Sequence, residues 1–286
     1  MGAGAWAVGV DATYLSRPLT LVATSPAPGG REVRVVDDVL DTSVSATYSP
    51  VPRLEMDAVL PFAAYRTGTG TTGVTSQTGP DLQTSALRDL RLGAAYAIVA
   101  RRLGRQSMVA MTTRLDLALP TGSAGSFAGD RGPVIAPSLG FELEHHALFA
   151  AAELGARLRE PVEIGTVHLA SELVWKMGLG AHLLDRERFD VAIETWALPT
   201  LVSQSRTLPD GTRADGVLVP AEWMASVRTR SGPVTMAVGG GGAIPLSSQT
   251  QTGPDGASTT DHFAGITSPG FRLALVLRYA PPAPRQ

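Results

Sequence analysis

The stretch VAMTTRLDLAL, residues 109–119, decides the fold because its side chains alternate between two characters. Leu115 and Leu117 belong to a mostly apolar set of odd positions, whereas Arg114 and Asp116 belong to an even set of small, polar or charged residues. Successive side chains of a β-strand point to opposite faces of a sheet. The stretch therefore predicts a strand with one apolar face and one polar face.

The same alternation is clear in two further stretches. In residues 148–159 the even positions are apolar or small and the odd positions carry the charges. In residues 271–279 the odd positions are apolar and the even positions include two arginines. Applied to the whole chain, this test predicts twelve strands, and single-chain bacterial barrels have an even number. They lie near residues 6–18, 33–49, 52–65, 88–101, 107–120, 133–145, 147–159, 166–183, 188–202, 216–230, 233–246 and 268–280.

Composition leaves strands as the only way for this chain to cross a membrane. Of its 286 residues, 17% are charged and 44% are apolar, and the mean hydropathy is +0.09. The longest uninterrupted apolar stretches, near residues 92–100 and 234–244, are shorter than the about 20 residues that a spanning helix needs.

Charge and cysteine content exclude other classes of protein and site. The formal net charge is −2 and no basic run occurs, so we set nucleic-acid binding aside. The chain has no cysteine, which excludes disulfides and thiolate metal sites.

The predicted connectors separate a membrane barrel from a soluble sandwich, which alternation alone does not do. Connectors at one end are short and lie at residues 49–52, 102–106, 145–146, 185–188 and 231–233. Connectors at the other end are longer, rich in Gly, Ser, Thr, Pro and Asp, and include residues 25–32, 67–88, 121–131, 203–215 and 247–266. This alternation of short and long connectors predicts a transmembrane, antiparallel, up-and-down β-barrel in the outer membrane of a Gram-negative bacterium. Its loops are predicted to be extracellular and both termini periplasmic.

The amino terminus, MGAGAW, lacks the charged and apolar regions of a signal peptide. An exported chain needs one, so we infer that this sequence starts near a mature terminus. A cytoplasmic protein is the competing interpretation.

Two short motifs resemble those of small outer-membrane barrels. Residues 87–96, LRDLRLGAAY, are similar to a GDLxLGxKY-type strand, from which they depart at Arg88 and Ala95. The sequence LPTG at residues 119–122 resembles the end of an amphipathic strand in the amino-terminal barrels of OmpA-like proteins. Together with the strand layout, the likeness covers most of the chain.

The end of the chain carries a second resemblance. Residues 271–279 resemble the aromatic-ended β-signal that the barrel assembly machinery reads, which implies that machinery as a partner during biogenesis. The proline-rich residues 281–286 follow a barrel domain at 1–280 and are either a frayed tail or the start of a linker. In OmpA-like relatives a periplasmic peptidoglycan-binding domain would come next, and peptidoglycan would then be a partner.

We expect no enzyme, no cofactor and no metal site. No G-x-S-x-G motif occurs, and the His145-His146 pair lies in a predicted tight turn. His168 and His182 share one predicted strand but lie 14 residues apart, too far for one site. A barrel-embedded enzyme would need a polar cluster that faces lipid at the outer leaflet.

The charged residues of the polar faces are predicted to line the lumen, and the apolar faces to contact outer-membrane lipid. The predicted lumen residues are Glu55, Asp57, Arg91, Arg114, Asp116, Glu142, Glu144, Glu153, Arg157, Arg159, Glu172, Lys176, Glu194, Arg228, Arg272 and Arg278. The predicted lipid-facing residues include Leu115, Leu117, Leu154, Leu158, Leu273, Leu275 and Leu277.

Two functions remain open at this point. Buried charges need partners, so a lumen plugged by paired charges is favoured, which makes the barrel a membrane anchor or a cell-surface interaction module of an OmpA-like protein. The alternative is a passive channel for small hydrophilic solutes, whose lumen charges would set its ion preference. The sequence names neither a solute nor an oligomeric state.

Overall fold

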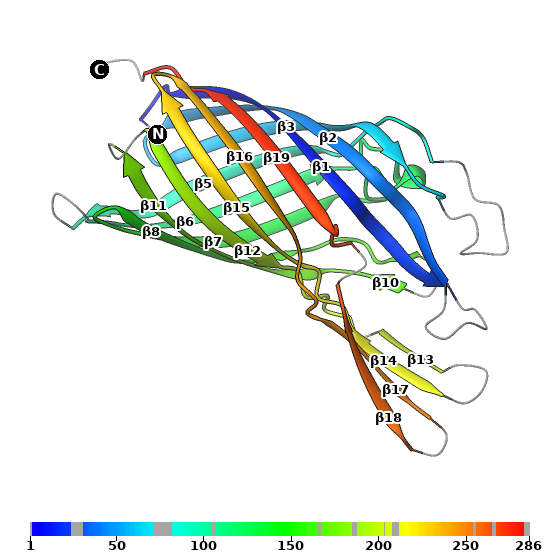
Figure 1. The fold of residues 1–286 in the computed structure, drawn as a ribbon. Helices are drawn as coiled ribbons and strands as arrows, with labels where there is room; N and C mark the ends of the chain where they lie inside the picture. The colour runs from blue at the N-terminus through cyan, green and yellow to red at the C-terminus, as the bar shows by residue number, and fades with distance from the viewer. Residues whose placement is uncertain are drawn as a thin grey trace.

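The computed structural model shows one β-barrel with long connectors and a small separate sheet at one end (Figure 1). The residues that the structure describes are 2–23, 31–70, 82–103, 107–164, 167–184, 188–202, 204–207, 212–253, 256–264 and 267–282. No helix in these ranges has both the length and the apolar character needed to span a membrane.

Twelve antiparallel strands form the barrel wall, which confirms the predicted fold class. They are β1 (Trp6–Ala23), β2 (Arg31–Val51), β3 (Leu54–Thr67), β5 (Leu90–Arg102), β6 (Ser107–Leu119), β7 (Val134–His145), β8 (Leu148–Arg157), β11 (Glu172–Leu184), β12 (Phe189–Ala197), β15 (Ala221–Ser231), β16 (Val234–Ala243) and β19 (Phe271–Tyr279). Each corresponds to one of the predicted segments. The two-residue β4 (Ala86–Leu87) pairs with β3 outside this count.

The barrel closes because its first and last strands pair. β1 and β19 are hydrogen-bonded from Val8 opposite Tyr279 to Ser16 opposite Phe271. All remaining neighbours in the wall are strands that follow one another along the chain, so the topology is up and down. Closure gives each strand a partner on both sides, as a backbone in a hydrocarbon environment requires.

The two ends of the barrel differ in the length of their connectors, as predicted. Residues 52–53, 103–106, 146–147, 185–188 and 232–233 connect the strands at one end, whereas the opposite connectors are residues 24–30, 68–89, 120–133, 158–171, 198–220 and 244–270. Both termini lie at the end with the short connectors (Figure 1). There Gly4 N donates to Ser49 O at 2.8 Å, and Ala280 N donates to Pro233 O at 2.8 Å. We call the end with the short connectors the short end, and the end with the long connectors the loop end.

Two predicted strands, 166–183 and 216–230, are wrong at their starts, because the barrel strands begin only at Glu172 and Ala221. The barrel strand β11 begins only at Glu172, and the preceding residues form a separate hairpin of β9 (Val162–Ile164) and β10 (Val167–Leu169). Alternating side chains do not reveal which neighbour a strand pairs with, so the pattern does not predict the break at residues 170–171. His168 and His182 consequently lie on different strands.

Two of the predicted loops, 203–215 and 247–266, contain strands that the sequence did not reveal. β13 (Gln204–Thr207), β14 (Arg213–Val217), β17 (Ser247–Thr252) and β18 (Ser258–Phe263) form a four-stranded sheet that projects from the loop end (Figure 1). β13, β17 and β18 are rich in Ser, Thr and Gln, and none of the four strands has an apolar period. A hydrogen bond from Ser205 and the guanidinium of Arg213 hold the pKa of Asp215, in this sheet, below its usual value.

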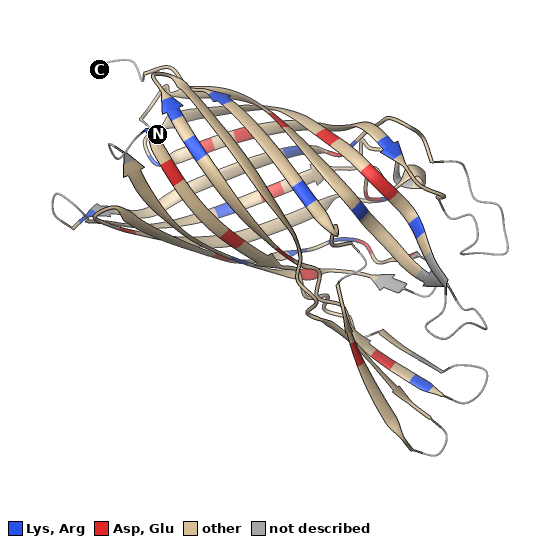
Figure 2. Cartoon of the chain, viewed as in Figure 1, with Lys and Arg blue, Asp and Glu red and all other residues tan. Residues whose placement is uncertain are grey.

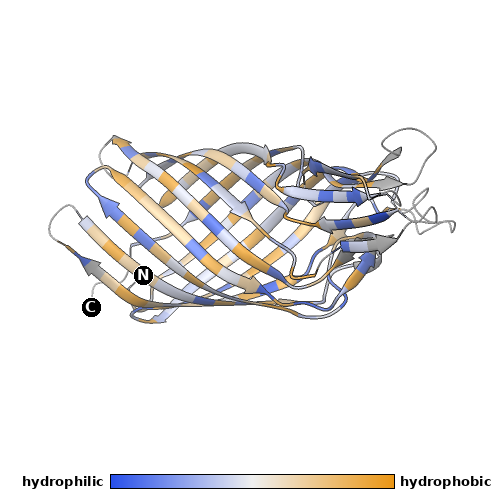
Figure 3. Cartoon of the chain, turned by 90° about the horizontal axis from the view of Figure 1, so that it is seen from below, coloured by the Kyte–Doolittle hydropathy of each residue, from blue (hydrophilic) through white to orange (hydrophobic). Residues whose placement is uncertain are grey.

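The main buried apolar cluster lies at the loop end. It consists of Leu19, Leu21, Val33, Val35, Val36, Val39 and Ala63, with Leu15, Leu82 and Phe127 packed against it. Val35 is completely buried. Along the rest of the wall, apolar and hydrophilic residues follow one another on the tilted strands (Figure 3).

The glycine run of β16 permits a close approach between two strands. A Cβ atom on Gly241 would lie 1.8 Å from the carbonyl oxygen of Trp223 on β15, whereas a Cβ on Gly240 would lie no nearer than 3.4 Å, to the flexible end of Leu273. The end of the Leu273 side chain can move aside, whereas the backbone of Trp223 cannot move without shifting its strand.

We therefore predict that Gly241→Ala lowers the free energy of unfolding by about 1 to 3 kcal/mol, because the strands must separate. Gly240→Ala should change it by less than about 1 kcal/mol. Both free energies are measured by urea unfolding of the refolded barrel, with the folded fraction read from heat-dependent mobility on gels. Equal stability of the two variants would contradict the close approach.

Candidate functional site

Several charged residues of the wall lie on its concave face. The strand order is β19-β16-β15-β12, yet Arg272 on β19 reaches Glu222 on β15, with 2.9 Å between Nε and Oε2. Its guanidinium also lies 5.3 Å from the ring centre of Trp196 on β12. Side chains converge across intervening strands only inside a curved wall. Charges are spread along the strands of this wall (Figure 2).

The neighbouring apolar positions lie on the opposite, convex face. Leu273, Leu275 and Leu277 flank the inward-facing positions of β19 and are 47–49% exposed. Leu115, Leu154 and Leu158 are 45–56% exposed, and Leu117 is half-buried. Their contact with lipid stays a prediction.

The most tightly connected group on the inner face is Asp57, Arg114 and Asp116. Arg114 Nη2 lies 2.8 Å from Asp57 Oδ1 and 2.6 Å from Asp116 Oδ1, and Arg114 Nε donates to Asp116 Oδ2 at 2.8 Å. The group spans β3, β5 and β6 across Gly93. A Cβ on Gly93 would lie within 2.4–2.7 Å of all three side chains, so the glycine provides the space for the ion pairs.

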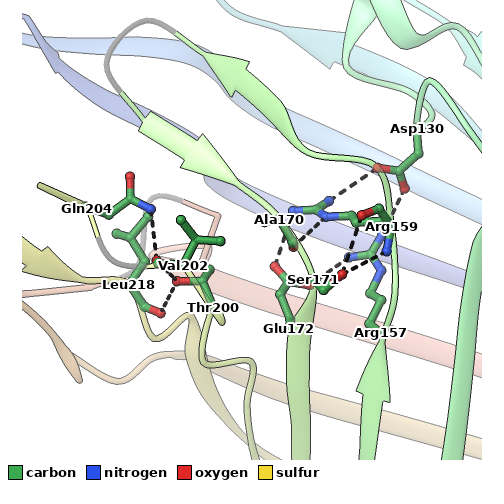
Figure 4. Close-up of polar contacts among 10 residues, drawn as sticks. All are labelled: Asp130, Arg157, Arg159, Ala170, Ser171, Glu172, Thr200, Val202, Gln204 and Leu218. Carbon is green, nitrogen blue, oxygen red and sulfur yellow. Dashed lines mark hydrogen bonds and ion pairs between the residues drawn. The ribbon is translucent and has the colours of Figure 1, made fainter.

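A second group joins the barrel to a connector at the loop end (Figure 4). Asp130, in the 120–133 connector, lies 3.0 Å from Arg157 and 3.3 Å from Arg159. Glu172 lies 3.3 Å from both arginines and its side chain is 4% exposed. Arg159 Nε also donates to Ala170 O. The four charges balance one another.

The 120–133 connector is held at further points of the wall. Asp89 accepts hydrogen bonds from Gly122 N at 2.9 Å and from Asp130 N at 2.7 Å. Arg66 Nη1 on β3 donates to Ser126 O, and the neighbouring Phe127 packs against the buried apolar cluster. The connector, which contains the short helix η1 (Ala124–Ser126), is therefore fixed to β3, β8 and the start of β5.

Three smaller groups also pair charges on the inner face. Lys176 Nζ lies 3.0 Å from Glu153, and Arg272 pairs with Glu222 as described above. Near the short end, Asp190 lies 2.6 Å from Arg228 and 2.5 Å from His182 Nδ1.

Several predicted lumen residues make no ion pair or hydrogen bond with the described part of the chain. They are Glu55, Arg91, Glu142 and Glu194, and Arg278 has one buried nitrogen, Nη2, without a partner. Glu144 does have an interaction. In the structure, about two thirds of the predicted lumen charges interact with a partner. The others have none among the described residues.

A cavity of about 330 Å³ lies beside some of these single charges. Its lining includes Thr112, Glu142, Glu153, Lys176, Glu194 and Trp196, from β6, β7, β8, β11 and β12. Three carboxylates therefore face one ammonium group, in a space large enough for a small solute.

Sequence reasoning missed several charged partners. Asp41, Asp190 and Glu222 lie in the alternating pattern of their strands, so the same test could have found them. Asp89 and Asp130 lie in connectors, where no periodic signal exists. Among the described residues, no group of three or more His, Asp or Glu side chains is arranged to hold a metal ion.

Removing the shared cation of the first group should destabilise the barrel. We predict that Arg114→Gln lowers the free energy of unfolding by about 2 kcal/mol, because Asp57 and Asp116 are left without their common partner. Asp57→Asn in the same chain should recover part of that loss.

The matched control is Lys176→Gln, which breaks a more exposed pair and should cost under about 1 kcal/mol. Urea titration of the refolded variants compares them. The assignment is wrong if Arg114→Gln is no less stable than Lys176→Gln.

Comparisons with known proteins agree with this architecture. No family model and no curated protein matches the chain. Among solved structures, the chain is similar to a COG4313 outer membrane channel from Pseudomonas putida F1, at 12% identity and a TM-score of 0.63, over 98% of this chain and 96% of that one.

Two further likenesses are weaker. A deletion mutant of the TodX monoaromatic hydrocarbon channel matches at 11% identity and a TM-score of 0.40, over 98% of this chain and 91% of that one. The outer membrane protease OmpT from Escherichia coli matches at 8% identity and 0.30, over 97% and 94%. At 12% identity, the likeness to the COG4313 channel shows the fold alone, and that fold is the outer-membrane β-barrel.

Proposed function

We propose that the chain is a passive channel for small hydrophilic solutes in the outer membrane of a Gram-negative bacterium. The observation that carries the proposal is the cavity of about 330 Å³, whose lining includes three carboxylates and one ammonium group. A fully plugged barrel has no need for such a space. Glu142 and Glu194, which line it, have no partner among the described residues and are exposed.

The adjoining part of the wall, next to β12, supports a solute path. The inner face of β15, β16 and β19 carries Ser226, Gly239 and Ala274 at matching register positions. These small side chains leave room that long charged side chains would occupy. In this account solutes pass along the small-residue wall, beside the carboxylates of the cavity.

The placement in the membrane is part of the proposal. Trp6, Tyr48 and Tyr279 are exposed at the short end, where amphipathic rings favour the headgroup level. We place that end and both termini in the periplasm, the connectors of the loop end outside the cell, and the apolar convex face in lipid. The channel acts without enzymatic chemistry.

A membrane anchor or surface-interaction barrel, as in OmpA-like proteins, is the second candidate. The observation that favours it is the 120–133 connector, which is fixed to several strands at the loop end. A peptidoglycan-binding domain and the barrel assembly machinery belong with this candidate as partners. The suggested linker at 281–286 stays a prediction, because residues 283–286 lie outside the described ranges.

Single-channel recording in planar bilayers separates the two candidates. We expect the refolded chain to give steady conductance steps. Under a salt gradient, Glu194→Gln should shift the reversal potential towards anion preference, because it removes a negative charge from the cavity wall. Asp261→Asn, in the projecting sheet, is the control and should leave the potential unchanged.

A silent barrel that is correctly folded and heat-modifiable would reject the channel and leave the anchor. Conductance that Glu194→Gln leaves unaltered would place the solute path elsewhere than the cavity.

A further inference from the structure

One row of residues across the wall forms part of the cavity of about 330 Å³. Glu142 on β7 pairs with Ala151 on β8, and Gly178 on β11 pairs with Glu194 on β12. Ala151 and Gly178 are opposite each other, so the row is continuous, and all four residues line the cavity. The two glutamates end the row, with about 14 Å between their Cα atoms, because three strand spacings separate them.

This row lies on the concave face of the wall. Beyond Glu194 it continues through Met224 and Gly241 to Arg272. Residues directly opposite each other on antiparallel strands share a face of the sheet. Arg272 reaches Glu222 on the inner side of the wall. The side chains of the row therefore point into the lumen, and both glutamates of the cavity are among them.

The two central residues of the row leave space between the glutamates. A Cβ atom on Gly178 would lie 3.4 Å from Cγ of Glu194, so the Glu194 side chain lies beside the glycine. Ala151 contributes only a methyl group. Glu142 and Glu194 are exposed, and neither has an ion pair or hydrogen bond with a described residue. Their carboxylate oxygens are available to a solute that lies across the small residues.

The charges of the lining favour a cation. Three carboxylates and one ammonium group give the lining a net charge of −2. The ammonium group belongs to Lys176, whose Nζ is already paired with Glu153 at 3.0 Å. Close by, Arg272 is paired with Glu222 at 2.9 Å. The nearby cations therefore have their own partners, and the two remaining negative charges are those of the glutamates that end the row.

We propose that the cavity binds a small organic dication, a linear solute with an amine or guanidine group at each end. One group pairs with Glu142 and the other with Glu194, through charge-assisted hydrogen bonds. The carbon chain lies over Ala151 and Gly178, since ligand pockets combine apolar lining with a few placed polar groups. The inference rests on the proposed channel function and deepens it, because it names the class of solute.

Binding of 1,5-diaminopentane tests the site without any need for conductance. The thermal midpoint of the refolded chain is measured in a neutral detergent as the diamine replaces sodium at constant ionic strength. We expect a saturable rise, because a ligand that binds only the folded state stabilises it. The uncharged 1,5-pentanediol, which has the same chain, should give no rise.

Variants of the lining separate the roles of its charges. Glu142→Gln and Glu194→Gln should each raise the apparent dissociation constant at least about fivefold, because each removes one charge-assisted pair. Lys176→Gln should lower it, because the variant removes a positive charge and frees Glu153; a general loss of stability would not tighten binding. Asp261→Asn, in the projecting sheet, is the control and should bind as the unaltered chain does.

Three results would overturn the site: a flat response to the diamine, an unaltered response in both glutamate variants, or an equal response to Mg²⁺, which has no carbon chain to place over the small residues. A barrel that is silent in planar bilayers but binds the diamine would reject the channel and keep the site. A conducting barrel without saturable binding would reject the site and keep the channel.

Discussion

The structure depends on one constraint, which is that a closed wall of paired strands gives every side chain one of two faces. Closure through β1 and β19 pairs the backbone N–H and C=O groups at both edges of the sheet. Because these groups then need no water as a hydrogen-bond partner, the wall can lie in hydrocarbon. Alternation then sends Leu273, Leu275 and Leu277 outward and Arg272 inward along a single strand. The exposed apolar surface and the enclosed charge both follow from this arrangement.

The enclosed charge is organised by small residues as much as by the charges themselves. Gly93 gives Arg114 the space to hold two aspartates, and the position opposite Arg272 is Gly241, over which Arg272 reaches Glu222. Paired charges gather at the loop end, where the 120–133 connector is fixed, and near Gly93. Single charges remain beside the cavity, and we assign the solute path to this place.

The sequence was sufficient for the barrel, because period-two alternation is a local signal that repeats in each strand. It predicted twelve strands, the contrast of connector lengths and the positions of Arg114 and Asp116 on one face. It could not predict the sheet of β13, β14, β17 and β18, whose polar strands have no apolar period. Nor could it predict that Asp130 meets Arg157 and Arg159, because such contacts depend on how a connector folds back. Partners within strands, such as Asp41, were within its reach.

Site-directed labelling of single cysteines in vesicles tests the two-faced wall most directly. Leu115, Leu154 and Leu275 on the convex face are replaced one at a time, as are Thr112, Ala151 and Ala274 on the concave face of the same strands. The account predicts that the first set reacts with lipid-phase probes and the second with water-soluble probes. The reverse pattern, or equal reaction of both sets with water-soluble probes, would contradict it.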